Sequence, residues 1–186
     1  MHVTDKPVTQ LCWVLRPLFW LQHRRHGQHL APAKAWARVP ALYAALTGFY
    51  AAIERRGSPL DAALRSLVQT RVSQINHCAF CIDLNAALSA QRSGSLDKAL
   101  AVDRWRESEL FDARERLTLE YAEAITHTDG QVTDAMIAGL RQHFDEKALI
   151  ELTALVAFQN LSSKFNAALD IPAQGLCRAP PGRPSN

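Results

Sequence analysis

Residues 74–85 read QINHCAFCIDLN and carry the side chains with the clearest capacity for chemistry. Cys78 and Cys81 stand three positions apart, and His77 directly precedes them. If Asn76 and His77 form a turn and a helix begins after it, both sulfurs lie in the first turn of that helix. Helix N-terminal amides and the helix dipole then stabilise a thiolate, which lowers the pKa of that cysteine and makes it a nucleophile. The spacing also lets the second thiol close a disulfide, so the pattern indicates a redox pair.

Two other interpretations of the cysteines remain open. A structural metal site needs four ligands, whereas there is no second Cys-x-x-Cys, Cys12 and Cys177 are isolated, and His77 is too close in sequence to complete a site. We therefore expect no metal and no cofactor. The plainer alternative is that Cys78 and Cys81 are two small buried hydrophobic side chains on a helix.

The composition of the whole chain is that of a globular protein. Its 186 residues are enough for one domain with a hydrophobic core, and 48% of them are apolar while 21% are charged. The net charge is +3, and the basic excess sits mostly at 23–29 and 177–186. That excess is too small and too scattered to predict nucleic-acid binding.

No stretch reaches the ~18–20 apolar residues that a membrane span requires. The apolar segment 11–22 is interrupted by Arg16 and Pro17, and no small-residue cleavage site of a signal peptide follows it. We interpret it as an amphipathic helix whose Trp13 and Trp20 pack on the core or on a neighbouring subunit. We expect a cytoplasmic protein, in which thiols stay reduced unless they do redox work.

Helical periodicity dominates the chain from residue 40 onward. Apolar residues at three- and four-residue spacing predict helices over 40–56 and 59–75. Between them, Gly57 suits a C-cap, Ser58 an N-cap and Pro59 the first turn of the second helix. The residues expected to face inward are Leu42, Leu46, Phe49 and Ile53 in the first helix and Leu60, Leu64, Leu67, Val68 and Val72 in the second.

The remaining helices are marked by their caps. The predicted helices run from near the cysteines to just before Ser93, then over 96–105, 111–130, 132–144 and 145–169. Asp112 with Glu115 forms the pattern of a capping box, and Thr133 suits the N-cap of the helix that follows it.

No alternating apolar and polar run is long enough to predict a strand, so the predicted fold class is all-α. We expect one helical domain over 39–171. It is preceded by an N-terminal helical extension over 1–38. An extended tail rich in Pro and Gly, over 172–186, follows it.

One internal similarity suggests a repeat. Residues 64–88 and 149–169 share a leading apolar pattern, a glutamine at Gln74 and Gln159, and a closing Asn-Ala-Ala-Leu. Two similar helical units could pack about a pseudo-twofold axis, with the additional residues of the first unit holding the cysteines.

The segment LRSLVQTRVSQINHCAFCIDLNAAL (64–88) resembles the core motif of the carboxymuconolactone decarboxylase-like superfamily, which includes alkylhydroperoxidase D. In outline, members read Arg-Val-Ser-Gln-Ile-Asn-Gly-Cys-x-x-Cys-x-x-x-His. The continuous match covers about 64–92, and a weaker pattern extends it to about 166. The resemblance implies an all-helical fold, a trimeric or hexameric homo-oligomer and thiol chemistry.

The resemblance also implies a role for each cysteine. In alkylhydroperoxidase D the second cysteine of the pair attacks a peroxide and the first resolves the sulfenic acid into a disulfide. By position, Cys81 would be peroxidatic and Cys78 resolving. A partner dithiol would reduce the disulfide again, and the substrate would be a small peroxide.

The family's proton relay is replaced in this chain. The glutamate before the pair falls at Ser66, and the histidine four residues after the second cysteine falls at Asn85. Neither side chain is a general base near pH 7. The family's glycine before the pair is His77, which could act as the base or only cap the turn. Glu151, at the register of Ser66 in the second repeat, is another candidate carboxylate.

Three functions follow from these observations. The first is a thiol peroxidase or thiol-disulfide oxidoreductase built on Cys78 and Cys81. The second is a carboxymuconolactone decarboxylase-like enzyme that acts on a small organic acid by proton transfer, in which the cysteines would be idle. The third is a non-enzymatic redox sensor or assembly subunit on the same fold.

Overall fold

The computed structural model describes residues 1–177, and every regular element in this range is helical. The elements are η1 (Val8–Gln10), η2 (Trp13–Leu15), α1 (Arg16–His26), α2 (Ala31–Trp36), α3 (Pro40–Ile53), α4 (Ala62–Ile75), α5 (Ala79–Ser93), α6 (Leu96–Leu100), η3 (Ala101–Arg104), α7 (Ala113–Thr126), α8 (Asp134–Leu140) and α9 (Glu146–Ala168). The predicted all-α fold class is therefore confirmed. The predicted tail is partly outside the described residues, because they end at 177.

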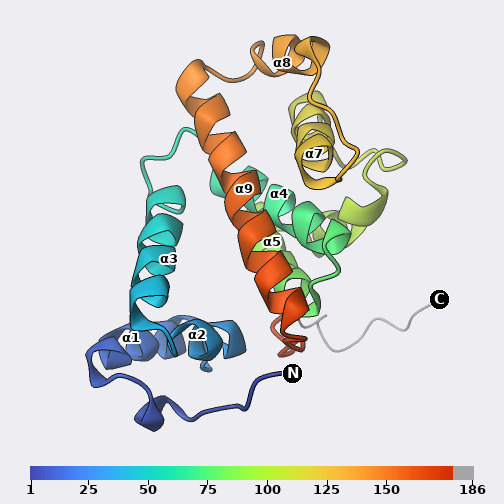
Figure 1. The fold of residues 1–186 in the computed structure, drawn as a ribbon. Coiled ribbons are helices and arrows are strands. Elements are labelled where there is room, and N and C mark those ends of the chain that lie inside the picture. The colour runs from blue at the N-terminus through green and yellow to red at the C-terminus, as the bar shows by residue number, and fades with distance from the viewer. Residues whose placement is uncertain (178–186) are drawn as a thin grey trace, which may run out of the picture.

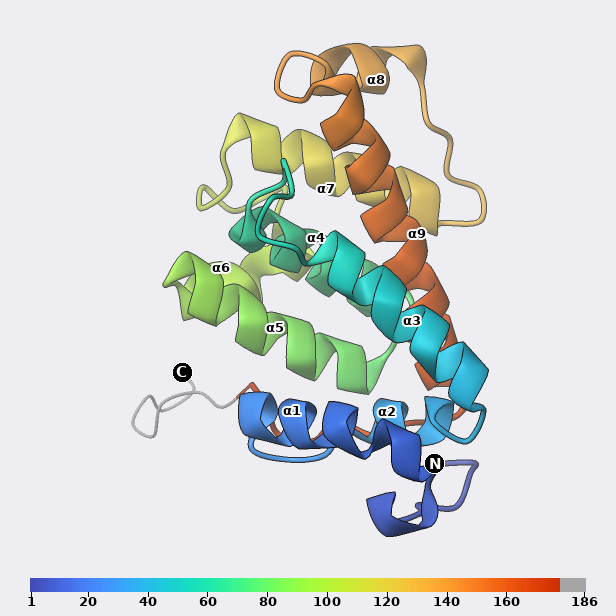
Figure 2. The same ribbon diagram turned by 90° about the vertical axis from the view of Figure 1, so that its left-hand side faces the viewer.

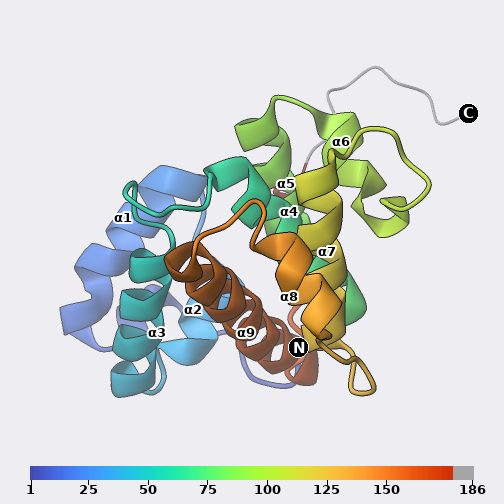
Figure 3. The same cartoon turned by 90° about the horizontal axis from the view of Figure 1, so that it is seen from above.

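The long helix α9 runs through the middle of the molecule (Figure 1). Helix α3 lies along one side of it and α7 along the other, as the view from above also shows (Figure 3). Helices α4 and α5 form a hairpin that packs on α9, and α1 and α2 lie across the end of the molecule beneath α5 (Figure 2). Within residues 1–177, no helix has the length and hydrophobicity to cross a membrane.

The core has two main parts, and the cysteines belong to the second. The first joins apolar side chains of α3, α4, α7, α8 and α9. In the second, the N-terminal segment covers the start of α5, so that Leu11, Leu15 and Phe19 share a cluster with Cys78 and Cys81. The N-terminal helices thus enclose the cysteines and form part of the single helical domain.

The expected burial of the two N-terminal tryptophans against the core is wrong. Trp13 is 74% exposed and Trp20 is 59% exposed, whereas Leu15 and Phe19 are buried. Residues four apart share a face of a helix, so when Leu15 and Phe19 face the core, both tryptophans face outward. Phe19 stacks on Tyr43 at 5.6 Å between ring centroids, and this contact fixes which face of α1 packs on the core. The alternative, contact with a neighbouring subunit, stays a prediction.

The inward face of α3 also differs from the prediction. Leu42 is 51% exposed and Phe49 is 48% exposed, while Tyr43 and Ile53 are buried and Tyr50 packs against the core. Tyrosines form a second stripe on this helix, and a tyrosine ring can be buried when its hydroxyl lies at a polar edge. The helix also ends at Ile53 rather than at 56.

Helix α4 begins three residues later than predicted. Asp61 is the N-cap of α4, and its side chain accepts a hydrogen bond of 2.8 Å from the amide of Leu64. Ser58 instead donates to Glu151 at 2.8 Å and accepts from the amide of Leu60. Asp is at least as good an N-cap as Ser, and the loop 54–61 ends at Asp61 rather than at Ser58.

Other cap predictions are confirmed. Asp112 and Glu115 form both hydrogen bonds of a capping box, and the side chain of Thr133 caps α8. Gly94 ends α5 in the left-handed conformation with φ 70°.

The two similar segments differ in structure. Residues 64–88 form a helix, a turn and a second helix, whereas 149–168 belong to the unbroken helix α9. Their leading halves are both helical and pack on each other, as α4 on α9.

Candidate active site

The turn before α5 brings the two cysteines together. The amide of Cys78 donates to the carbonyl of Ser73 at 3.0 Å, and that of His77 donates to the carbonyl of Gln74 at 3.1 Å. His77 adopts the left-handed conformation with φ 51°. Glycine adopts this conformation without strain, which accounts for the glycine that the family pattern has here. The side chain of His77 is exposed, while both cysteines are buried.

Both sulfurs lie at the N-terminus of α5, as the spacing predicts. Cys78 is the N-cap, and its Sγ accepts a hydrogen bond of 3.2 Å from the amide of Cys81. The two cysteines are joined as a disulfide, with their Cα atoms 5.3 Å apart. The unpaired amides of this helix end favour negative charge on either sulfur once the bond is reduced.

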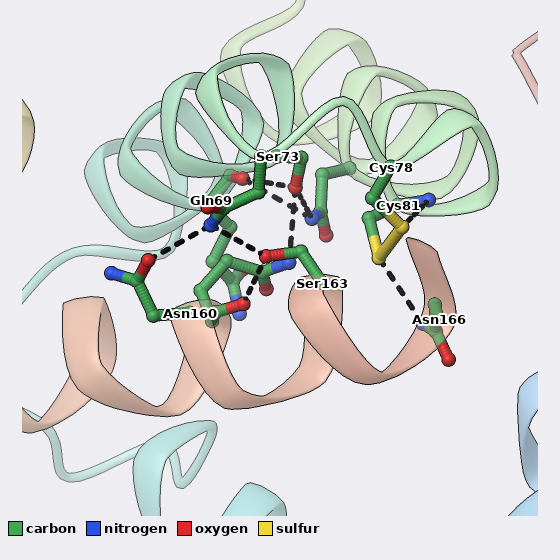
Figure 4. The surroundings of a disulfide bond; sticks show 10 residues. Gln69, Ser73, Cys78, Cys81, Asn160, Ser163 and Asn166 are labelled. Carbon is green, nitrogen blue, oxygen red and sulfur yellow. Dashed lines mark hydrogen bonds between the residues drawn. A yellow bond between two sulfur atoms is a disulfide. The ribbon is translucent and has the colours of Figure 1, made fainter. Parts of the chain in front are cut away.

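An asparagine from a distant helix completes the surroundings of Cys81. The Nδ2 of Asn166, on α9, donates to the Sγ of Cys81 at 3.2 Å (Figure 4). Asn166 is buried, and a hydrogen bond to the charged form of an acid favours ionisation. Sequence reasoning missed this residue, although the shared Asn-Ala-Ala-Leu pairs Asn166 with Asn85.

Asn85 belongs to a neutral network next to the disulfide. Its Nδ2 donates to the Oγ of Ser73 at 3.1 Å, and the Nε2 of Gln159 donates to the same oxygen at 3.0 Å. Ser73 in turn donates to the carbonyl of Gln69 at 2.6 Å. Amides and hydroxyls therefore occupy the position where the family pattern has a histidine. These groups can bind and orient a substrate, but they do not exchange protons near pH 7.

Ser66 lies in a different environment from the cysteines. Its Oγ accepts a hydrogen bond of 2.8 Å from Arg92 on α5, and Arg92 also pairs with Glu54 at 2.7 Å. Glu54, at the end of α3, is buried and approaches Arg65 at 3.5 Å as well. A carboxylate from α3 thus neutralises arginines beside the position where the family pattern has its glutamate on α4. Sequence reasoning missed Glu54 because only the tertiary fold brings α3 to α4.

Glu151, the other candidate carboxylate, is not among the residues around the disulfide. It pairs with Arg55 and accepts a hydrogen bond of 2.8 Å from Ser58. Desolvation acts to raise the pKa of Glu151, but the hydrogen bonds from Arg55 and Ser58 lower it overall. Glu151 therefore links α9 to the loop after α3.

A cavity of about 250 Å³ opens beside Cys81. Helices α1, α2, α3, α5 and α9 form its wall together with Gln69 of α4, and most of the wall is apolar. Cys81, Asn85, Gln159 and Asn166 all line it, whereas Cys78 does not. Among the described residues that line the cavity, none is Asp or Glu. Of the two disulfide cysteines, Cys81 is thus the one that lines the cavity.

Of the five site residues predicted from sequence, the structure brings three around this cavity or the disulfide. Cys78, Cys81 and Asn85 lie within the site. His77 lies on the turn outside it, and Ser66 contacts Arg92 instead. Within residues 1–177, the His, Cys, Asp and Glu side chains form no group of three that could hold a metal ion.

Residues 40–124 match the model of the carboxymuconolactone decarboxylase family. The uncharacterized protein YnjA of Escherichia coli (strain K12) is 49% identical over 95% of this chain and 97% of its own length.

Two crystal structures share the fold at lower identity. The alkylhydroperoxidase AhpD core of an uncharacterized peroxidase-related protein from Ralstonia eutropha JMP134 superposes with a TM-score of 0.85 at 18% identity, over 93% of this chain and 92% of that one. A cysteine-to-alanine variant of the debrominase Bmp8, in complex with 2,3,4-tribromopyrrole, gives 0.83 at 19% identity, over 95% and 93%. The family-model match and the similarity to YnjA place this chain in the carboxymuconolactone decarboxylase family, and its fold is that of the AhpD core.

Proposed function

We propose that this protein is a thiol peroxidase of the alkylhydroperoxidase D type, in which Cys81 attacks the peroxide and Cys78 resolves the product. The observation that carries the proposal is the position of the pair. Both sulfurs lie at the N-terminus of α5, but only Cys81 lines the cavity. A substrate in the cavity therefore meets Cys81 first, and Cys78 lies behind it at disulfide distance.

The reaction consumes one peroxide and one dithiol in each cycle. The Cys81 thiolate forms a bond to the distal oxygen of a hydroperoxide, the O–O bond breaks, and the electron pair leaves with the alkoxide, which takes a proton to become an alcohol. The Cys78 thiolate then attacks the sulfenic sulfur, the disulfide forms, and hydroxide leaves as water after protonation. An external dithiol supplies two electrons and two protons to restore both thiols.

In this proposal the thiolate is favoured by hydrogen bonding alone. The helix N-terminus and the Asn166 amide stabilise negative charge on Cys81. His77, which remains a candidate base, would have to leave its exposed position on the turn to reach the buried sulfur. The absence of Asp and Glu from the described cavity wall favours thiol chemistry over the proton transfers of a decarboxylase-like enzyme.

Peroxide treatment of variants that each lack one cysteine of the pair tests the proposal. Reduced protein exposed to cumene hydroperoxide should form the Cys78–Cys81 disulfide, which alkylation and intact mass detect. Cys78→Ser should trap a sulfenic acid at Cys81 that dimedone labels, and Cys81→Ser should remain unlabelled. Turnover with dithiothreitol should be lost in Cys81→Ser and kept in the double variant Cys12→Ser with Cys177→Ser. Oxidation at Cys12 or Cys177 while the pair stays alkylatable would refute the redox-pair assignment.

A second reaction suits the same pair of thiols. The cavity is lined by Trp36, Tyr43, Tyr50, Phe80 and Phe158, and its volume exceeds the ~150 Å³ of an apolar cavity that binds benzene. Bmp8, which shares the fold, is a debrominase. Reductive debromination would convert an aryl bromide and the two thiols into the arene, bromide and the disulfide. Dithiol-dependent release of bromide from 2,3,4-tribromopyrrole, without consumption of cumene hydroperoxide, would favour this reaction over the first.

A further inference from the structure

Arg25 gives the end of the cavity that α1 forms a positive charge, while burial and Arg25 lower the pKa of His26, which therefore contributes a neutral ring that can donate a hydrogen bond. Arg25 and His26, in the last turn of α1, line the cavity together with Leu18, Leu21 and Gln22 of the same helix. Leu18 packs in the cluster that holds Cys81. Arg25 follows Leu18 by seven positions, which is ~10 Å along a helix axis. Arg25 and His26 therefore line the cavity about two helical turns beyond Leu18.

No acidic side chain within residues 1–177 pairs with Arg25. The nearby carboxylate, Glu54, already contacts Arg92 at 2.7 Å and Arg65 at 3.5 Å. Tyr50 also lines the cavity, and burial and Glu54 raise its pKa, while Arg25, Arg92 and Arg65 act in the other direction. Because Glu54 is shared between Arg92 and Arg65, the charge of Arg25 has no acidic partner within residues 1–177. An anionic group of a bound molecule would compensate it.

Three other residues of the cavity wall carry buried polar atoms that lack a partner. The Oε1 of Gln69 and the Oδ1 of Asn166 are buried acceptors, and the Nε1 of Trp36 is a buried donor. All three residues line the cavity, and none of these atoms has a hydrogen-bond partner within the described chain. Buried polar groups in native proteins are nearly always paired, so they point to a ligand group that both donates and accepts hydrogen bonds. A hydroperoxide, R–O–O–H, is such a group.

We propose that the cavity selects hydroperoxides of small, apolar carboxylic acids, with the carboxylate held by Arg25 and His26 and the hydroperoxide held beside Cys81. The aromatic middle of the cavity binds the apolar body. The inference rests on the proposed peroxidase function and adds the class of substrate. In the reaction, the distal oxygen bonds to the Cys81 sulfur, and the alkoxide that leaves retains its carboxylate and takes a proton from water. The product is the corresponding hydroxy acid.

A matched pair of substrates tests the proposal in turnover. The probes are 4-(2-hydroperoxypropan-2-yl)benzoic acid and its methyl ester, with dithiothreitol as reductant. The native protein should prefer the acid. Arg25→Gln should lower kcat/KM for the acid by about fivefold, the order expected of one partly exposed ion pair, and leave the ester unchanged. Arg24→Gln is the control, because Arg24 lies over the Trp20 ring at 5.0 Å and does not line the cavity. Equal turnover of acid and ester, or equal losses in both variants, would overturn the proposal.

A binding experiment separates this inference from the peroxidase function. Titration of the disulfide form with 4-isopropylbenzoate, followed by calorimetry, should show binding that Arg25→Gln and His26→Asn weaken and Arg24→Gln does not. The uncharged 4-isopropylbenzamide should bind less tightly. Binding of the benzoate without turnover of any hydroperoxide would disprove the peroxidase function and keep the acid site. Turnover of cumene hydroperoxide without benzoate binding would disprove the acid site and keep the peroxidase function.

Discussion

At the scale of single residues, the sulfur of Cys81 accepts a hydrogen bond from Asn166, and neutral amides and hydroxyls of α4, α5 and α9 form the network next to the disulfide. We expect Asn166→Ala to raise the pKa of the reduced Cys81 thiol, because the thiolate loses a donor. A hydrogen bond to a charged group contributes about 1.5 kcal/mol or more, so the alkylation rate at pH 7 should fall by about tenfold.

The rate of iodoacetamide alkylation of Cys81 across pH 5 to 10, in the Cys78→Ser background, measures this effect. Asn160→Ala is the control, because Asn160 also lies on α9 but contacts Asn76 and Thr126 instead of sulfur. An unchanged pH profile in Asn166→Ala would show that the helix terminus alone sets the reactivity of Cys81.

Restoring the family's relay is a second residue-scale prediction. Asn85→His places a titratable ring in the cavity wall, and general-base assistance is typically worth ~10²–10⁴-fold. Ser66→Glu alone should change little, since Arg92 beside it is already paired with Glu54. The double change should accelerate alkylation of Cys81 below pH 8 more than Asn85→His alone. A double variant no faster than the native protein would mean that the geometry no longer supports a relay.

The parts of the site that could be predicted from sequence are local ones. Cys78, Cys81 and the turn at His77 lie within one helical turn of each other, so their spacing predicts how they meet. Asn166 reaches the site from α9, while Glu54 reaches the arginines beside Ser66 from the end of α3, and only the packing of the helices brings them there. The shared Asn-Ala-Ala-Leu was a signal for Asn166, because it marks equivalent positions in two segments that pack side by side.

At the scale of elements, the inward face of α4 and the capping box of α7 are confirmed, whereas the cap at Ser58 and the inward face of α3 are not. Asp112 with Glu115 follows a local rule and is confirmed. On α3, both the Leu42–Phe49 stripe and the Tyr43–Tyr50 stripe have helical spacing, and local sequence does not decide between them. The structure selects the tyrosines because α1 covers that side, where Phe19 stacks on Tyr43.

Glu123 joins three elements and gives a prediction for stability. It accepts hydrogen bonds from Arg71 on α4 at 2.6 Å and from Trp105 at 2.8 Å, and it pairs with Arg106 at 2.7 Å. Burial acts to raise the pKa of Glu123, but the hydrogen bonds from these three residues lower it below its usual value of 4.5. Removing one partner of a buried ion pair costs about 3–5 kcal/mol, so Glu123→Gln should be strongly destabilising at pH 7.

The pH dependence of this loss has a definite sign. A carboxyl with a lowered pKa in the folded state contributes stability that is present above its unfolded pKa and is lost as the pH falls through its folded pKa. The difference in unfolding free energy between native protein and Glu123→Gln should therefore shrink below about pH 4.5. Urea unfolding at pH 7 and pH 3.5 measures it. Glu120→Gln on the same helix is the control, and a difference that persists unchanged at pH 3.5 would contradict the account.

At the scale of the whole molecule, the N-terminal segment has one face that packs on the core and another that is exposed. Leu11, Leu15 and Phe19 cover the cysteines, while Trp13 and Trp20 are exposed on the opposite side. Val14 adds to this exposed apolar surface. Large exposed apolar patches on soluble proteins mark interaction sites. Since the family resemblance implies a homo-oligomer, we expect a second copy of the chain to cover this surface.

Charge introduced at the two tryptophans tests that expectation without disturbing the fold. The double change Trp13→Glu with Trp20→Glu should reduce the mass measured by light scattering to that of one chain, because burying two unpaired carboxylates at an interface is unfavourable. The far-UV circular dichroism spectrum should stay unchanged, since neither side chain supports the core that encloses Cys78 and Cys81. Leu110→Glu is the control, an exposed apolar residue in the loop before α7. An oligomer that survives the tryptophan changes but dissociates with Leu110→Glu would place the subunit contact at the other end of the molecule.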